Sequence, residues 1–243
     1  MKGQYLQEIP YTVRSSRKAK RVVLQIDPLK GLVVVLPVRL DPACIPNILR
    51  EKRAWIERHK DSILQAASRN RSRYVIPDRV RLRALGTQLK VRLHTNGDKG
   101  ISLQQVQPEV LEISGPGRID PGEAASLLRQ WLMQRAREVL PDWLEELAAQ
   151  HGFSYNRVCI RCQKTRWGSC SGRKTISLNC KLLFLPTRLV EHVLIHELCH
   201  TREPNHSRAF WRLFKGLQPD TPALHQRLKR LWHEAVPAWA EPE

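Results

Sequence analysis

Long apolar runs are missing from this 243-residue sequence, and no segment approaches the roughly 18 consecutive apolar residues of a membrane-spanning helix. Residues 1–16 lack the apolar core of about 7–15 residues that a signal peptide carries. Low-complexity tracts are also missing, and the otherwise ordinary composition excludes collagen-like and wholly disordered proteins. These absences predict a cytoplasmic protein with no membrane partner.

Acidic residues are scarce relative to basic ones. The chain has 41 Lys and Arg against 23 Asp and Glu, which gives a formal net charge of +18. A basic excess of this size attracts polyanions, so nucleic acid or an anionic substrate is a candidate partner. A basic surface that only aids solubility would give the same composition.

The first 115 residues combine short strand-like segments with one helical pattern. Alternating or apolar segments predict strands at 9–15, 20–27, 31–38, 80–85, 88–94, 101–106 and 109–114. Residues 27–31 and Asn96-Gly97 are hairpin-type turns, and Leu32, Val34 and Leu36 should share one face. After Asp41-Pro42, a period of 3.6 down to Ala67 predicts one long amphipathic helix.

The Gly- and Pro-rich segment 115–122 predicts a domain boundary. A helical stripe follows from Leu127 to Leu147, with a kink expected at Pro141. Two short strands near 158–160 and 175–178 precede helices that reach about Ala235. The expected class is α+β: a basic β-rich region with one long helix over 1–115, a mainly helical domain with a small sheet over 116–236, and a tail over 237–243.

The segment His196-Glu197-Leu198-Cys199-His200 lies in an apolar helical stretch that begins after Pro186. Histidines four residues apart lie one turn above each other on the same helix face, so both imidazoles can reach one metal ion with Glu197 beside it. This HExxH pattern supplies two metal ligands and a carboxylate, the smallest set of residues typical of a zinc hydrolase. A third ligand is needed to distinguish it from a chance match.

His206 is the expected third ligand, six residues beyond His200, where Pro204 and Asn205 favour a turn. We expect the helix to stop near Arg202 and the chain to turn back. Glu203 is an alternative third ligand. His192 shares the helix face, but a straight helix carries it about 12 Å from His200, too far for one ion, so it should pack instead.

Three histidines and one water would leave an open, catalytic type of zinc site with one ion. Zinc lowers the pKa of its water, and Glu197 can take the proton as the water attacks a carbonyl and pass it to the leaving nitrogen. The predicted function is zinc-dependent hydrolysis of a peptide or protein substrate.

Several blocks of sequence around this motif resemble the YgjP-like family of zinc metallopeptidases, which is related to SprT-like and WLM proteases. They are residues 166–171 (RWGSCS), Leu178-Asn179, 196–200, 205–207 and Phe210-Trp211, with weaker similarity over most of the chain, including residues 49–60. Cys180 departs from the family pattern, which commonly has an aromatic residue there.

The resemblance implies a zincin-type catalytic domain with His196, His200 and His206 as ligands and Glu197 as base. It implies no particular substrate. Arg166 and Asn205 are candidate substrate-binding residues, although Arg166 could equally pair with an acid. Trp167 is either a wall of the cleft or a core anchor, and the helical spacing of Phe210, Trp211 and Phe214 favours core positions.

Two other functions fit parts of the sequence. Cys159 and Cys162, with Cys170 and Cys180 downstream, could form a structural zinc site in a nucleic-acid-associated protein, although the second pair lacks the close spacing of a zinc ribbon. Without an export signal, these cysteines are expected to be thiols or ligands. Alternatively, the basic surplus could bring phosphate-containing molecules such as nucleotides to the metal.

Overall fold

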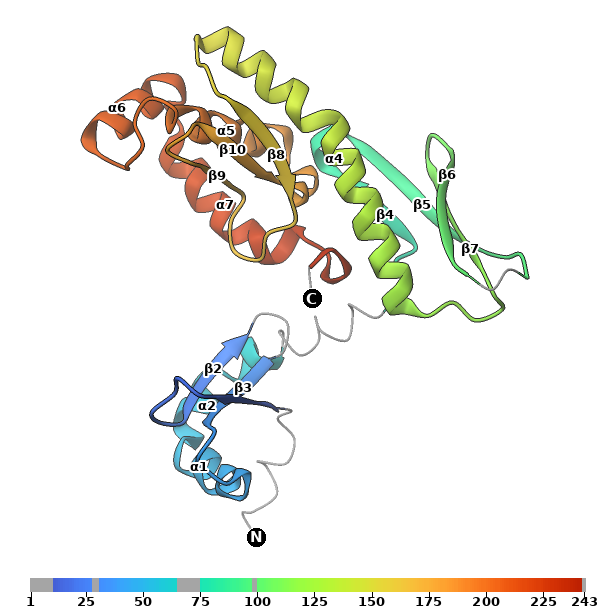
Figure 1. The fold of residues 1–243 in the computed structure, drawn as a ribbon, viewed down its shortest axis with the longest axis vertical. Coiled ribbons are helices and arrows are strands. Elements are labelled where there is room, and N and C mark those ends of the chain that lie inside the picture. Colours follow the sequence, from blue (N-terminus) through green and yellow to red (C-terminus); the bar gives the residue numbers. More distant parts are fainter. Residues whose placement is uncertain (1–10, 28–30, 65–74, 98–99, 242–243) are drawn as a thin grey trace. The chain divides into compact units, whose positions relative to one another are not determined.

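The computed structural model describes residues 11–27, 31–64, 75–97 and 100–241 (Figure 1). The chain forms two compact units, Met1–Val75 and Ile76–Glu243, which are described separately below. Both combine small sheets with helices, so the α+β class expected from the sequence is confirmed. The division falls well before the boundary expected near residue 115.

A three-stranded sheet forms the core of the first unit. Its order is β1-β3-β2, with β1 spanning Tyr11–Ser16, β2 Val23–Asp27 and β3 Gly31–Pro37. β2 and β3 are antiparallel, as expected for a hairpin, whereas β1 pairs with β3 in parallel. The central place of β3 explains why all its residues are buried. Leu32, Val34 and Leu36 share the core of this unit, as predicted.

Short helical segments separated by single non-helical residues follow where the sequence pattern suggested one long helix, and residues 60–64 are again helical after the break at His59. α1 (Ile45–Glu51) ends at Lys52, and α2 (Arg53–Arg58) begins directly after it. A straight helix over 42–67 would be about 39 Å long, whereas β3 spans only about 23 Å. Breaking the helix keeps Leu49 and Ile56 on the same small core. Residues 65–67 of the expected helix lie outside the described residues.

The second unit opens with a four-stranded sheet in the order β4-β5-β7-β6, where β4 is Arg79–Leu82, β5 Thr87–Thr95, β6 Ser102–Gln107 and β7 Val110–Gly115. Gly97 has a positive φ of 75°, which suits the turn expected there. The strands beside it do not form a hairpin, because β7 pairs with β5 in parallel and with β6 antiparallel. β7 carries the buried Leu111 and Ile113 and takes an internal position, while the polar β6 takes the edge.

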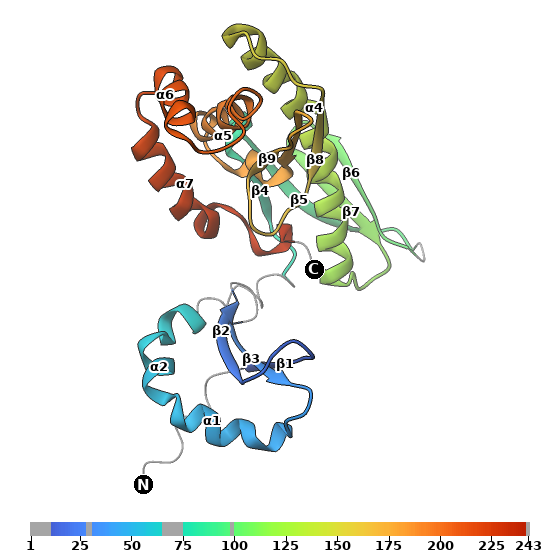
Figure 2. The same ribbon diagram turned by 60° about the vertical axis from the view of Figure 1, so that its left-hand side comes forward.

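The long helix α4 (Pro121–His151) connects this sheet to the rest of the second unit. Asp120 caps it by accepting from the backbone N–H groups of Gly122 and Glu123 at 2.8 and 3.0 Å, and the helix continues through Pro141. It contacts β6 and, further along, β8 (Arg157–Arg161) (Figure 2). The residues on both sides of position 115 therefore share one hydrophobic core, and the compact division falls elsewhere.

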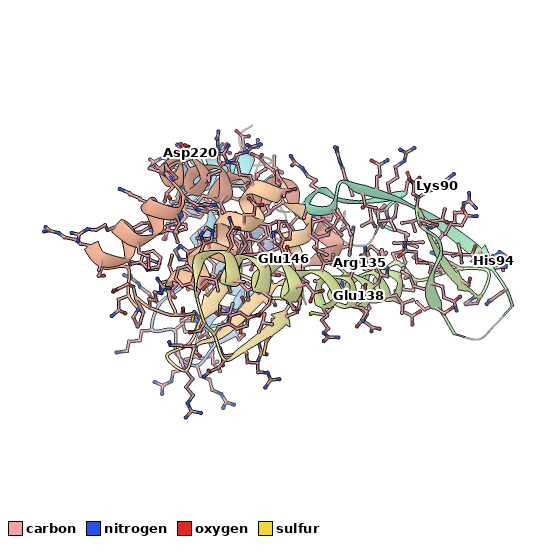
Figure 3. The ribbon with its side chains drawn as sticks, turned by 90° about the horizontal axis from the view of Figure 1, so that it is seen from above. Lys90, His94, Arg135, Glu138, Glu146 and Asp220 are labelled. Carbon is pink, nitrogen blue, oxygen red and sulfur yellow. The ribbon has the colours of Figure 1, made fainter. Side chains whose placement is uncertain are left out.

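The outer side of α4 is charged. Arg135, Glu138 and Glu146 lie along it (Figure 3). Arg135 and Glu138, three residues apart, form an ion pair at 3.0 Å. The helix thus has one face for the core and another for solvent.

A second sheet and the last helices complete the unit. In the order β8-β10-β9, β10 (Thr175–Asn179) is parallel to β8 and antiparallel to β9 (Gly168–Cys170). The following elements are η4 (Cys180–Phe184), α5 (Thr187–Cys199), α6 (Arg208–Leu217), α7 (Thr221–Ala235) and η5 (Ala238–Ala240). The described part of the expected tail, residues 237–241, packs on the rest of the second unit, because Trp239 is buried against Phe184. Among the described residues, no helix has the length and apolar content that a membrane crossing needs.

Candidate metal centre

Helix α5 brings His196 and His200 together at its carboxyl end. His196 lies in the last turn, and His200 is the residue that caps the helix. Their rings are nearly perpendicular, with centroids 4.8 Å apart. The rest of the helix is held in the core by the apolar residues Leu189, Val190, Val193, Leu194, Ile195 and Leu198. Both imidazoles therefore stand at the end of a rigid, buried element.

His206 returns to these two histidines through the turn that the sequence suggested. The backbone N–H of Glu203 still bonds to the carbonyl of Cys199 at 2.9 Å, and the chain then turns at Pro204. Ser207 caps α6 by accepting from the N–H of Phe210 at 3.2 Å. Between these two anchors, His206 places its Nε2 atom 3.0 Å from Nε2 of His196.

The three histidines could hold one metal ion. One nitrogen from each lies within 4.8 Å of the other two, so small ring rotations bring all three to the distances of about 2.0–2.1 Å at which imidazole binds zinc. The Nδ1–H of His200 donates to the carbonyl of Glu203 at 3.0 Å, which leaves Nε2 free of its proton. Burial, with the neighbouring histidines, lowers the pKa of His196 to about 3. Neutral imidazoles are the form that binds metal, and the residues fit a zinc ion.

The aromatic ring of Phe210, on α6, packs against all three histidines. Phe210 is fully buried, and its centroid lies 5.0, 4.5 and 4.8 Å from those of His196, His200 and His206. Trp211 stacks on His206 at 5.6 Å. The helical spacing predicted Phe210 as core, which is correct, but it did not reveal that this core residue fixes the ring positions of all three histidines.

Glu197 is a buried carboxyl beside the cluster. Glu197 is only 5% exposed, and its Oε2 atom has no hydrogen-bond partner within the described part of the chain. Burial raises the pKa of this carboxyl to about 8, against the opposing charge of Arg166. A buried carboxyl oxygen without a partner is unusual in a stable core and is typical of a site that acts on a ligand.

Two residues of the 166–171 block lie close to Glu197. A Cβ atom on Gly168 would be only 2.6 Å from Oε1 of Glu197, so β9 passes against this carboxyl with room for glycine alone. Arg166 is exposed, and its charge acts on Glu197. Sequence reasoning missed Gly168, although the block containing it carried the family resemblance.

Asn179 belongs to a block that carried the family resemblance, but sequence reasoning gave it no role. It is fully buried at the end of β10, and its Nδ2 donates to the carbonyls of Gln163 and Arg166 at 3.0 and 2.8 Å. Its backbone N–H bonds to the carbonyl of Trp167 at 2.9 Å. One amide thus fixes the loop that leads to Gly168. A polar residue directly after the apolar Ile176–Leu178 pattern is the signal that could have found it.

The remaining candidates take other places. Asn205 is exposed in the turn beside His206, and its carbonyl accepts from Ser207 at 2.7 Å. Glu203 contributes its carbonyl to His200, and the cluster contains His206 instead of Glu203. His192 is buried and donates through Nδ1 to Gln218 at 2.7 Å, the packing role expected for it.

Trp167 and the cysteines bear on the alternative interpretations. Trp167 is buried with its ring 4.4 Å from that of Trp232, so it anchors the core.

The four cysteines Cys159, Cys162, Cys170 and Cys180 do not gather as one ligand set: over the described ranges, only the three histidines form a metal-sized group. The structural zinc site considered from the sequence is therefore not assembled.

Comparison with known protein families identifies the family of this chain. A family model described as "YgjP-like, metallopeptidase domain" matches residues 20–231. A search of curated proteins found no match. Among solved structures, the metallopeptidase zymogen abylysin of Pyrococcus abyssi is 28% identical, with a TM-score of 0.34, over 37% of this chain and 91% of that one. Because the family match spans most of the sequence, the resemblance drawn from the motifs is confirmed, and the chain belongs to the YgjP-like family of metallopeptidase domains.

Proposed function

We propose that this protein is a zinc-dependent peptidase that holds one zinc ion through His196, His200 and His206 and uses Glu197 as its general base. The observation that carries the proposal is the convergence of three imidazole nitrogens beside a buried carboxyl oxygen that has no partner. Membership of a metallopeptidase family supports a peptide or protein substrate.

Zinc bound at this position would supply Lewis acidity, which acidifies a coordinated water and polarises a carbonyl group. Glu197 is placed to accept the proton that the attacking water loses and to return it to the leaving amine. Arg166 lies near enough to influence the charge of Glu197, and its exposed guanidinium is available to a substrate carbonyl or carboxylate. Asn205 stays a candidate substrate contact next to His206.

The edge of the small sheet offers a way to hold a peptide. β9 pairs with β10 on one side, and within the described residues no strand pairs with its other side. An extended peptide can add to such an edge through backbone hydrogen bonds. Because Gly168 of β9 touches Glu197, a peptide on this edge would pass beside the base.

Metal removal tests the proposal directly. We expect the purified protein to contain about one zinc per chain and to cleave an unfolded polypeptide. Dialysis against a chelator should lower the rate at least ~100-fold, and one equivalent of zinc should restore it, because no other described group supplies the Lewis acid. Elemental analysis and peptide mapping measure both quantities. Consumption of nucleotides with no polypeptide cleavage would contradict the proposal and favour the phosphate-directed alternative.

Substitution of Gly168 tests the contact with Glu197. In Gly168→Ala the new Cβ lies 2.6–2.9 Å from three atoms of the Glu197 side chain, which must move because pairing with β10 holds the strand. We expect kcat/KM for the polypeptide to fall about 10- to 100-fold while zinc content stays unchanged. Gly172→Ala is the matched control, since nothing lies within 4 Å of its added Cβ and activity should be retained. Equal activity in both variants would remove Gly168 from the site.

A further inference from the structure

Two cysteines meet at the ends of neighbouring strands, away from the histidine cluster. β8 and β10 run parallel, and their last paired residues are Arg161 and Asn179. Cys162 directly follows the last residue of β8, and Cys180 directly follows the last residue of β10 as the first residue of η4, so the two cysteines come next after paired residues. Backbones of neighbouring strands are about 4.8 Å apart, which is within the range of about 4.4–6.8 Å between the Cα atoms of a disulfide.

The two sulfur atoms already interact. The thiol of Cys180, which lies 3.9 Å from Oδ1 of Asn179, is also close enough to Cys162 to act as a hydrogen-bond donor to its sulfur. Cys162 in turn lies 3.6 Å from the carbonyl of Ala240, to which its own thiol can donate. Cys180 belongs to the core of the second unit and Cys162 packs against that core, whereas Cys159, three residues before Cys162 and on β8, does neither. Side chains three apart on a strand point to opposite faces, so Cys159 is not the neighbour of Cys162.

The surroundings give the two thiols different reactivity. The hydrogen bond from Cys180 lowers the pKa of Cys162 to about 7, and the charges of Lys181 and Arg129 act in the same direction against burial. The pKa of Cys180 is raised, first by that hydrogen bond and then by burial. The thiolate is the reactive form, so Cys162 is the sulfur that reacts first.

Only Cys162 of the pair can be reached from outside. It lines a pocket of about 640 Å³ together with Ser126, Arg129, Gln130, Met133, Gln134 and Arg137 of α4. Cys180 is 1% exposed. A small oxidant can therefore reach Cys162 through the pocket, while Cys180 is buried beside it. Elsewhere, burial raises the pKa of Cys170 and brings that of Cys199 to about 12, which disfavours their reaction.

We propose that Cys162 and Cys180 form a dithiol that peroxide converts to an intramolecular disulfide. The Cys162 thiolate attacks one oxygen of hydrogen peroxide; an S–O bond forms, the O–O bond breaks, and the departing hydroxide takes up a proton to become water. Cys180 then gives up its proton and attacks the sulfur of the Cys162 sulfenic acid. The S–S bond forms, the S–O bond breaks, and a second water leaves.

The modification changes the contacts of the carboxyl-terminal segment. As a thiol, Cys162 can donate a hydrogen bond to the backbone carbonyl of Ala240. Ala240 follows the buried Trp239 and precedes Glu241. Glu241 pairs with the fully buried Lys181 at 2.8 Å. A disulfide sulfur has no proton to donate, so oxidation removes one of the bonds that hold this segment beside β8. A dithiol reductant reverses the change.

Peroxide treatment of the full-length, reduced protein tests the proposal. We expect free thiols to fall from six to four per chain in a fast phase, with the remaining four reacting at least ~10-fold more slowly. Peptide mapping should find the peptide of Cys162 linked to that of Cys180, lighter by two hydrogens, and dithiothreitol should separate them. Thiols that all survive the fast phase, or a linkage between any other pair, would overturn the proposal.

Variants separate the roles of the two sulfurs. In Cys180→Ser, Cys162 should stop at the sulfenic acid, which a cyclic dione such as dimedone traps. In Cys162→Ser, the fast phase should disappear. Cys159→Ser is the matched control on the same strand and should keep both the fast phase and the linkage. If Cys180→Ser does not fold, mapping of the wild-type protein and of Cys162→Ser still decides. A fast phase that persists in Cys162→Ser contradicts the proposal.

Discussion

Glu197→Gln is expected to lower kcat for polypeptide cleavage by about 10²–10⁴-fold while leaving zinc bound, which is the range that a positioned general base contributes. Glutamine has the same shape but cannot accept a proton from water. Burial disfavours the charged form of the Glu197 carboxyl and so raises its pKa. Replacing this carboxyl with a neutral amide should therefore not destabilise the folded protein. Steady-state kinetics with elemental analysis of the same sample measures both effects.

A second acidic residue of α5 provides the control for this substitution. Glu191 lies on the same helix, six residues before Glu197, and is half-buried. Glu191→Gln makes the same chemical change away from the cluster, so activity should stay within about twofold. If Glu197→Gln keeps wild-type activity, Glu197 is not the base.

His206→Ala is expected to abolish both zinc binding and cleavage. Loss of a supporting contact to a ligand weakens metal affinity by about 10–100-fold, and loss of the ligand itself should exceed this. His206 is exposed between α5 and α6, so its removal spares the core and the fold should persist. A competition titration with a zinc chelator, together with circular dichroism, separates loss of metal from loss of structure.

The same measurement decides between the two candidate third ligands. Glu203→Ala should retain zinc because the contribution of Glu203 to His200 is its backbone carbonyl, which alanine also has. His94→Ala, an exposed histidine on β5 (Figure 3), is the neutral control. Zinc that survives in His206→Ala but is lost in Glu203→Ala would reverse the assignment.

Local spacing explains which parts of the site were predictable. A separation of four residues fixes two histidines on one helix face, and Pro204 with Asn205 indicates where the chain turns to return His206. Both inferences concern neighbours along the sequence. The approach of Gly168 to Glu197 depends on how β9 packs beside α5, and nothing near residue 168 encodes that distance.

The same contrast holds for the fold. The strands were largely recognisable from their alternating patterns, but the pairing of β5 with β7 and the register between β8 and β10 depend on tertiary packing. For that reason, the sequence placed Cys159 and Cys162 together as a CxxC pair, whereas the structure places Cys162 beside Cys180. The broken helix after residue 44 likewise follows from the size of its sheet, not from its own periodicity.

The simultaneous packing of α4 on both sheets ties the histidine centre to strands that contribute no ligand to it. Detaching β4–β7 would strip the apolar side of this helix and leave Leu128 and Leu132 in water. We propose that the smallest independently folding fragment with the histidine centre begins near Ile76. Trimming the chain at residue 116 would instead cut through a single cooperative folding unit.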